Sequence, residues 1–419
     1  MNSRERLQAT LDHREPDRLC VDFGAGFQTG MGVGAVHRLR QAVLGASDYR
    51  VKVIEPYQML GEIDEELRQA LGLDVVGVHG GGTMFGFRTD EGWKPLELMD
   101  GTPVLVPERF NITVEANGGW LIYPDGDTTA PPRGRMPQGG FFFDAVIDQE
   151  PLEGREPSLA GNTEEFGVIS DRDVQLIARQ AEHYATRTGY GIYMTLPGCG
   201  FGDIATVPAP WMKHPKGIRA VDAWYRLTAK RPDFVRAIFE KQCEFALQTS
   251  ERLAAAVGDN ADVAFVSGTD FGQQQGPFIS PKAYRTLFKP FHTRVNGLIH
   301  ARTKWKTFIH SCGSVYQFIG DFIEAGFDVL NPVQCAAADM DPRRLKQEFG
   351  RHLVFWGGGV DTQKTLPFGT PDEVYRQVRE RIDIFAPGGG FVFNGIHNIL
   401  SNVPTENLLA MFRALRDAR

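Results

Sequence analysis

The chain has 419 residues, a length that β/α barrels with insertions reach as a single unit. Hydrophobic residues make up 42% of it and charged residues 23%, which excludes a mainly disordered chain. The formal net charge of -7 argues against broad nucleic-acid binding, because such proteins need a cationic surface to displace counterions from phosphates. We therefore expect a small-molecule or protein partner.

The sequence also bears on location. No apolar run approaches the ~20 residues of a membrane-spanning helix, and the N-terminal segment is too charged for a signal peptide. Five cysteines without the dense spacing of a disulfide framework fit a reducing compartment, where thiols stay free. We expect a cytoplasmic protein that binds neither membrane nor nucleic acid.

Eight short apolar runs, each bounded by Gly, Pro or Asp, predict buried parallel strands. They begin near Leu19, Val75, Gly191, Asp262, Lys306, Asp328, Leu353 and Phe391. Between most of them, apolar residues recur at three- and four-residue spacing and predict helices, as in 234–257 and 315–326. The alternation predicts an α/β fold, a TIM-type (β/α)8 barrel spanning 1–419.

The interval 83–172 breaks this rhythm. It carries Gly and Pro throughout and has the pattern of short strands and turns. We interpret it as a β-rich insertion after the second strand, within the barrel. Three consecutive phenylalanines at 141–143 either cover the barrel mouth or form a core for the insertion itself.

Polar residues follow several of the predicted strands. In a barrel of this type the C-terminal ends of the strands face the active site, so these residues are candidates for it. His310 and Cys312 are two residues apart, so both side chains lie on one face, where an imidazole and a thiolate can bind a soft divalent cation. His397 follows the last run, and closure of the barrel would bring it to the same mouth. The sequence thus predicts a zinc site with three protein ligands and an open fourth position, as in catalytic zinc sites.

Other polar residues at strand ends are candidate catalytic residues: Asp270, Asn331, Gln334 and Asn398. They either position substrate and orient the metal ligands or cap helices in the loops that follow. Cys335 is either an extra ligand or a small side chain packed at the barrel rim. Whether Cys335 or Asp270 adds a fourth ligand stays open at this point.

Several ordered blocks of the sequence resemble the uroporphyrinogen decarboxylase superfamily, namely 3–18, 267–291, 308–334, 355–363 and 394–412. The resemblance implies an enzyme with a β/α barrel. Decarboxylases of the superfamily carry an Arg-rich segment after the first strand, which grips the carboxylates of a tetrapyrrole. Here no Arg or Lys occurs from Val21 to Val36, so porphyrin decarboxylation is disfavoured.

The zinc-dependent methyltransferase branch of the superfamily is more similar to this chain. Its members hold zinc with a His-x-Cys pair and a Cys shortly before a Pro-x-Glu-Asn-Leu block. His310 and Cys312 match the pair and the block stands at 404–408, but the third position is His397. With one thiolate, the zinc site keeps a net positive charge and is a stronger Lewis acid, suited to polarising an oxygen as its methyl group leaves.

The leading hypothesis is a zinc-dependent methyltransferase that demethylates a small methoxylated or methylated substrate and passes the methyl group to a corrinoid. No Asp-x-His-x-x-Gly run of a corrinoid-binding domain occurs, so we expect the cobalamin on a separate corrinoid-binding protein, and we keep a homodimer as a further expectation. The alternatives are a methylcorrinoid-to-thiol or folate methyltransferase, and a uroporphyrinogen decarboxylase-like lyase, best supported by Asp22. A barrel that binds a small ligand without turnover is the remaining alternative.

Overall fold

The computed structural model describes residues 1–149 and 157–418. Its central sheet has eight parallel strands in the order β1-β18-β17-β16-β15-β12-β11-β4. Their bounds are β1 Cys20–Val21, β4 Val75–Val78, β11 Gly191–Thr195, β12 Val263–Ser267, β15 Lys306–His310, β16 Val329–Asn331, β17 Val354–Trp356 and β18 Phe391–Phe393. Each strand begins at the first residue of a predicted apolar run or one residue later. The predicted α/β barrel fold is confirmed.

The sheet curls into a barrel because its two end strands, β1 and β4, meet. The backbone N–H of Asp74 donates to the carbonyl of Val21 at 2.8 Å, and the Asp74 carboxylate accepts from the N–H of Val21 at 3.0 Å. Gly77 in β4 permits this approach, since a Cβ there would lie 1.9 Å from the carbonyl oxygen of Ala25. The glycine is therefore a requirement of barrel closure.

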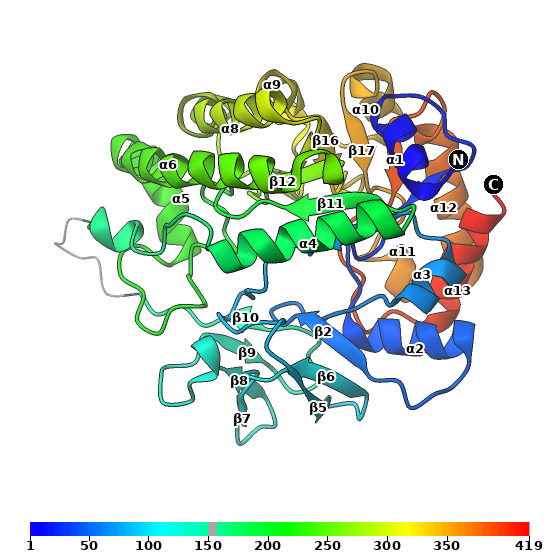
Figure 1. Cartoon of the computed structure of the whole chain (residues 1–419), viewed down its shortest axis with the longest axis horizontal. Helices are drawn as coiled ribbons and strands as arrows, with labels where there is room; N and C mark the ends of the chain where they lie inside the picture. Colours follow the sequence, from blue (N-terminus) through cyan, green and yellow to red (C-terminus); the bar gives the residue numbers. More distant parts are fainter. Residues whose placement is uncertain (150–156, 419) are drawn as a thin grey trace.

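Helices surround the barrel (Figure 1). They are α1 Ser3–Leu11, α2 Val33–Leu44, α3 Glu65–Leu71, α4 Asp171–Arg187, α5 Val221–Lys230, α6 Pro232–Val257, α7 Pro281–Ala283, α8 Lys289–Arg302, α9 Ile319–Glu324, α10 Pro342–Phe349, α11 Thr365–Phe368, α12 Pro371–Phe385 and α13 Thr405–Arg416. Their sequences bury one stripe: α4, for example, buries Ile177 and Ala181, four residues apart on one face. Within the described residues, no helix combines the length and apolar character needed to cross a bilayer.

The barrel interior is a packed core rather than a channel. Inward side chains of alternate strand positions form one apolar cluster, which includes Val75, Tyr193, Val263, Phe265, Phe308, Val329, Val354, Trp356 and Val392. Leu7 and Leu11 of α1 join it, and Leu7 lies against Gly191, the first residue of β11, so α1 closes the N-terminal end. Any site within the barrel must then lie at the opposite, C-terminal end.

Between β4 and α4, the described residues form six short strands: β5 Trp93–Glu97, β6 Pro103–Pro107, β7 Ile112–Val114, β8 Trp120–Ile122, β9 Gly134–Met136 and β10 Asp144–Ala145. They stand beside the barrel, drawn below it in Figure 1. Residues 150–156 of the predicted 83–172 insertion lie outside the described residues, and the division of the chain at those bounds stays a prediction.

The sheets of the insertion also include strands that precede β4 in the sequence. Its two sheets have the orders β10-β9-β8-β7 and β3-β2-β6-β5, and β2 Val51–Glu55 and β3 Leu60–Gly61 precede β4. Sequence analysis predicted no strand there, because β2 is stabilised by its parallel pairing with the distant β6. The two sheets beside the barrel therefore contain strands from before β4 in the sequence as well as strands from after it.

The phenylalanines at 141–143 divide between surface and core. Phe143 is fully buried, with its ring centroid 5.8 Å from that of Phe85 and 6.2 Å from that of Phe110. Phe141 and Phe142 are each 37% exposed. Phe143 therefore serves as a core residue of the insertion.

Candidate metal centre

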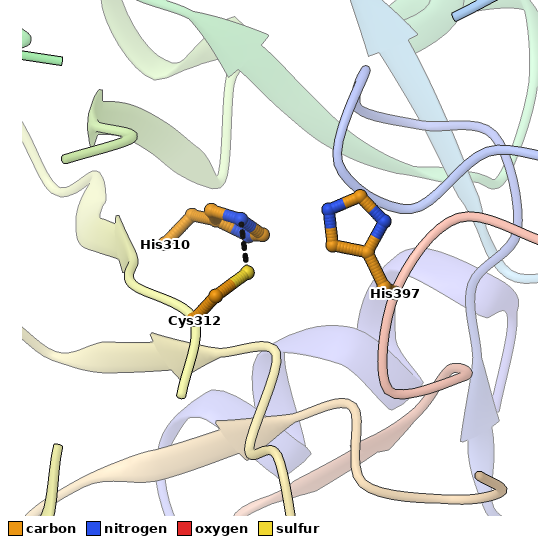
Figure 2. Close-up of side chains that lie close together, drawn as sticks. All are labelled: His310, Cys312 and His397. Atoms are coloured by element: carbon orange, nitrogen blue, oxygen red, sulfur yellow. Dashed lines mark hydrogen bonds between the residues drawn. The ribbon is translucent and has the colours of Figure 1, made fainter. Parts of the chain in front are cut away.

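Strand periodicity aims His310 at the barrel axis. Phe308 belongs to the interior cluster, and His310, two residues later on β15, projects to the same face at the strand's C-terminal end. Cys312 follows just beyond the strand. His397 arrives from the loop after β18, and Figure 2 shows its ring turned toward the other two side chains from the opposite side.

The three side chains converge closely. The thiol of Cys312 donates to Nε2 of His310 at 3.3 Å, and the ring centroids of His310 and His397 are 5.5 Å apart. One ligand atom from each residue lies within 4.8 Å of the others, and in the described part of the chain this is the one such group of three or more His, Cys, Asp or Glu residues. Two nitrogens and one sulfur at this spacing suit a zinc ion, which prefers such donors at about 2.0–2.3 Å.

The protonation states favour ligation by the histidines. Burial lowers the pKa of His310 to about 4, and burial together with the neighbouring His310 lowers that of His397 to about 4. Both imidazoles are therefore neutral at pH 7, and each has one unprotonated ring nitrogen that could bind a metal. Burial and the nearby Asp270 raise the pKa of the Cys312 thiol well above its usual value, so this ligand must lose a proton when a metal binds.

Two predicted residues hold the backbone around Cys312. Oδ1 of Asp270 accepts from the N–H of Cys312 at 2.7 Å, and Oε1 of Gln334 accepts from the N–H of Gly313 at 2.8 Å. Burial raises the pKa of Asp270. These bonds fix the loop that carries the thiol, and a third predicted residue, Asn331, contacts His310 directly.

Asn398 faces away from the three converging side chains, although it follows His397. Its Oδ1 accepts from the N–H of Gly30 at 2.6 Å, and its Nδ2 donates to the carbonyl of Phe27 and to Oε1 of Gln58, both at 2.7 Å. The structure thus brings Asp270, Asn331 and Gln334 to the ligand-bearing segments, whereas Asn398 organises the loop after β1.

Cys335 and Asp22 have other partners. The Cys335 thiol donates to the carbonyl of Val333 at 3.3 Å and lies outside the converging group. Asp22 is buried in the barrel, where Oδ2 accepts from Nε1 of Trp356 at 2.9 Å and Oδ1 from the N–H of Ala25 at 3.1 Å. Burial raises the pKa of Asp22 to about 6. Both oxygens of this carboxyl group are thus engaged in structural contacts.

A cavity of about 500 Å³ lies between the barrel and the insertion, and none of the three converging residues lines it. Residues from the ends of β11 and β12, the loop after β1, and β2 line it. Its acidic residues are Glu55, Glu165 and Asp203, and none of its described lining residues is Lys, Arg or His. Sequence analysis missed Glu55 because it ends an unpredicted strand, and Asp203 because only a Gly-rich run before it marked that region.

Fold and donor set together define a β/α-barrel protein with a candidate zinc-type centre at the C-terminal end of the barrel. The chain belongs to the uroporphyrinogen decarboxylase (URO-D) family, whose sequence profile matches residues 204–418. The family predicted from the sequence is thereby confirmed.

Relatives in this family include proteins with two different activities. The uroporphyrinogen decarboxylase of Pelobacter propionicus is 27% identical over 222 residues, which cover 53% of this chain and 60% of that protein. The methylated-thiol–coenzyme M methyltransferase of Methanosarcina mazei is 25% identical over 219 residues, covering 51% of this chain and 52% of that protein. The matches therefore span only about half to three fifths of these relatives.

A solved structure supports the fold over the whole chain. A methyltransferase from Methanosarcina mazei matches with a TM-score of 0.53 at 14% identity, covering 100% of this chain and 99% of that one. At this identity the match shows a shared fold. The chain is thus related to methyltransferases and to decarboxylases of one family.

Proposed function

We propose that this protein is a zinc-dependent methyltransferase that demethylates a small methylated or methoxylated substrate and passes the methyl group to a separate corrinoid protein. The observation that carries the proposal is the convergence of His310, Cys312 and His397. His310 ends the fifth barrel strand and Cys312 follows it, whereas His397 follows the last strand, so folding alone brings them together.

The surroundings of the three residues support a metal-binding role. Both histidines are neutral at pH 7, and Asn331 orients one of them. Asp270 and Gln334 fix the loop that presents the thiol. When bound, zinc would supply Lewis acidity toward the atom that loses its methyl group. Cys312, as the one anionic ligand, leaves the centre with a net positive charge, which favours an oxygen leaving group.

The cavity between the barrel and the insertion favours methyl transfer over tetrapyrrole decarboxylation. A substrate with many carboxylates needs basic side chains, and Arg in particular, to balance its charge. None of the described residues lining the cavity is basic, whereas three are acidic. Asp22, the buried residue that best supports a lyase, already accepts hydrogen bonds from the Trp356 side chain and from the backbone N–H of Ala25.

Methyl transfer from a methylcorrinoid to a thiol or a folate is the second candidate. The relative from Methanosarcina mazei is named for methylated thiols and coenzyme M, which supports thiol chemistry at a related site. His397 stands where the resemblance places a second cysteine, and this difference favours the demethylation direction.

The decisive experiment tests methyl transfer to an added corrinoid protein. Purified protein loaded with zinc would be mixed with a methoxylated aromatic compound and a reduced corrinoid protein, and the corrinoid's absorption spectrum would report its methylation. We expect methylation only when all components are present. Demethylation by the chain alone, without any cobalamin, would refute the proposal, as would full activity in protein with less than about a tenth of an equivalent of zinc.

A further inference from the structure

Two links connect the cavity wall to the segments that carry the candidate metal ligands. Asn398, next to His397 in sequence, hydrogen-bonds to Phe27 and Gln58, which both line the cavity. On the other side, Asp203 in the cavity wall interacts electrostatically with Asp270, the residue that holds Cys312. The three metal ligands do not line the cavity themselves, so the cavity reaches them through these neighbouring residues.

The acids of the cavity differ in their partners. Glu165 is neutralised by Arg219, whose Nη1 lies 2.6 Å from its Oε1. Glu55 accepts hydrogen bonds from the N–H groups of Tyr57 and Gln58 at 2.9 and 2.7 Å but has no basic partner among the residues that the structure describes. Asp203 accepts from the N–H of Ala205 at 2.9 Å through Oδ1. Its Oδ2 has no hydrogen-bond partner within the described chain.

Two acidic groups thus face one cavity without a counter-charge. Glu55 is only 3% exposed, and burial raises the pKa of Glu55 and of Asp203 to about 7. An ionised carboxylate is costly to bury unless it is paired. A positively charged ligand would supply the missing pair.

Six aromatic side chains also line the cavity: Phe27, Tyr57, Phe166, Trp211, Phe245 and Phe265. Aromatic faces attract cations and pack against flat apolar rings. Tyr57 stands within electrostatic reach of both Glu55 and Asp203. Aromatic and acidic surfaces are therefore combined around one volume.

We propose that this cavity is the substrate chamber and that it selects a methylated compound with a flat apolar body and a positively charged ammonium group, and rejects carboxylates. The inference rests on the proposed function for the methyl group and adds the charge class of the substrate. Glu55 is the more deeply buried of the two acids, so the ammonium group is placed toward Glu55 and the methylated atom toward the metal centre. A carboxylate in its place would meet two acids and no base.

The test compares three probes of one skeleton: 4-methoxybenzylamine, 4-methoxybenzyl alcohol and 4-methoxybenzoate. Their binding to the full zinc-loaded chain is measured by isothermal titration calorimetry without corrinoid, so that no turnover occurs. We expect the amine to bind roughly tenfold or more tightly than the alcohol, since a desolvated cation–π contact and an ion pair each add to affinity, and the benzoate to bind weakest.

Substitutions locate the selectivity. Glu55→Gln and Asp203→Asn should each reduce the preference for the amine over the alcohol, Glu55→Gln more strongly. Asp383→Asn, which removes an exposed acid of α12 that does not line the cavity, should leave the preference unchanged. If Glu55→Gln fails to fold, Asp203→Asn carries the comparison.

The outcomes separate the two proposals. The proposed substrate chamber would be refuted by any of three results: equal binding of the three probes, tightest binding of the benzoate, or no binding of any probe. A preference for the amine that survives both substitutions would overturn it as well. Selective binding of the amine without methylation of an added corrinoid protein would support the chamber and count against the proposed function instead.

Discussion

His310 and Asn331 are register partners on the neighbouring strands β15 and β16, and their side chains share a hydrogen bond between Nδ1 and Oδ1. The amide orientation of Asn331 follows from its other contact, because Nδ2 donates to the carbonyl of Trp356 at 2.7 Å. Oδ1 therefore faces the ring and accepts its Nδ1–H. The lone pair of His310 then resides on Nε2, the nitrogen that faces Cys312.

Removing this contact should weaken the metal site. We expect Asn331→Leu to lower zinc affinity roughly 10- to 100-fold, because the ring loses the partner that fixes its tautomer. Competition with a chromogenic chelator measures the affinity. Asn407→Leu is the matched control, since Asn407 is an equally buried amide that donates to the carbonyls of Leu366 and Gly369 instead. Equal zinc affinity in the Asn331 and Asn407 variants would contradict the assignment.

Replacing the one anionic ligand should have a larger effect. Cys312→Ala should lower zinc affinity by more than about 100-fold, beyond the effect of losing an outer partner. The barrel should stay folded, because the thiol lies at its mouth rather than in its core. Cys335→Ala, a cysteine outside the converging group, should retain full zinc content by elemental analysis. Loss of zinc in the Cys335 variant alone would show that a different cysteine binds the metal.

Exchanging the third ligand should change reactivity more than binding. His397→Cys keeps a zinc-type donor but adds a second thiolate, which lowers the Lewis acidity of the ion. Cleavage of an oxygen-bound methyl group should slow more than alkylation of a thiol. Rates of both reactions with the same corrinoid protein provide the comparison, and equal slowing of the two would argue against polarisation of oxygen by the metal.

Zinc binding should strengthen as the pH rises. The Cys312 thiol has a pKa well above its usual value and loses one proton on ligation, whereas both histidines, with pKa values of about 4, are already deprotonated. Affinity should therefore fall about tenfold for each unit of pH decrease between about pH 8 and pH 6. Calorimetry in buffers of different ionisation enthalpy should detect one proton released. A pH-independent affinity over this range would exclude the thiolate as a ligand.

Barrel closure makes a separate prediction about stability. Gly77→Ala would place its Cβ 1.9 Å from the carbonyl oxygen of Ala25, so the free energy of unfolding should fall by roughly 1–3 kcal/mol or more. Gly82→Ala, where a Cβ meets nothing within 4 Å, should change it by less than about 1 kcal/mol. Urea denaturation measures both. Similar stability of the two variants would mean that the loop after β1 can move away from β4.

The barrel could be predicted from the sequence because each of its strands has a local sequence pattern. Each of the eight apolar runs is bounded by its own turn residues, and a spacing of two residues is enough to place His310 and Cys312 on one face. The strand β2 escaped prediction because it belongs to a sheet only through its pairing with β6, about fifty residues away, beyond the two-residue strand β3 next to it. Pattern within a segment is visible in sequence, whereas pairing between distant segments is not.

By itself the sequence determined the fold class, the family and the types of donor atom at the candidate centre. Only the tertiary structure decided how the candidates divide: His397 turns toward His310, while its neighbour Asn398 turns toward Phe27 and Gln58. It also placed Glu55 and Asp203 in one cavity, although they lie in segments with no shared motif. The physical reason is that side-chain direction in loops and the lining of a cavity depend on contacts between residues far apart in the chain, which no local periodicity records.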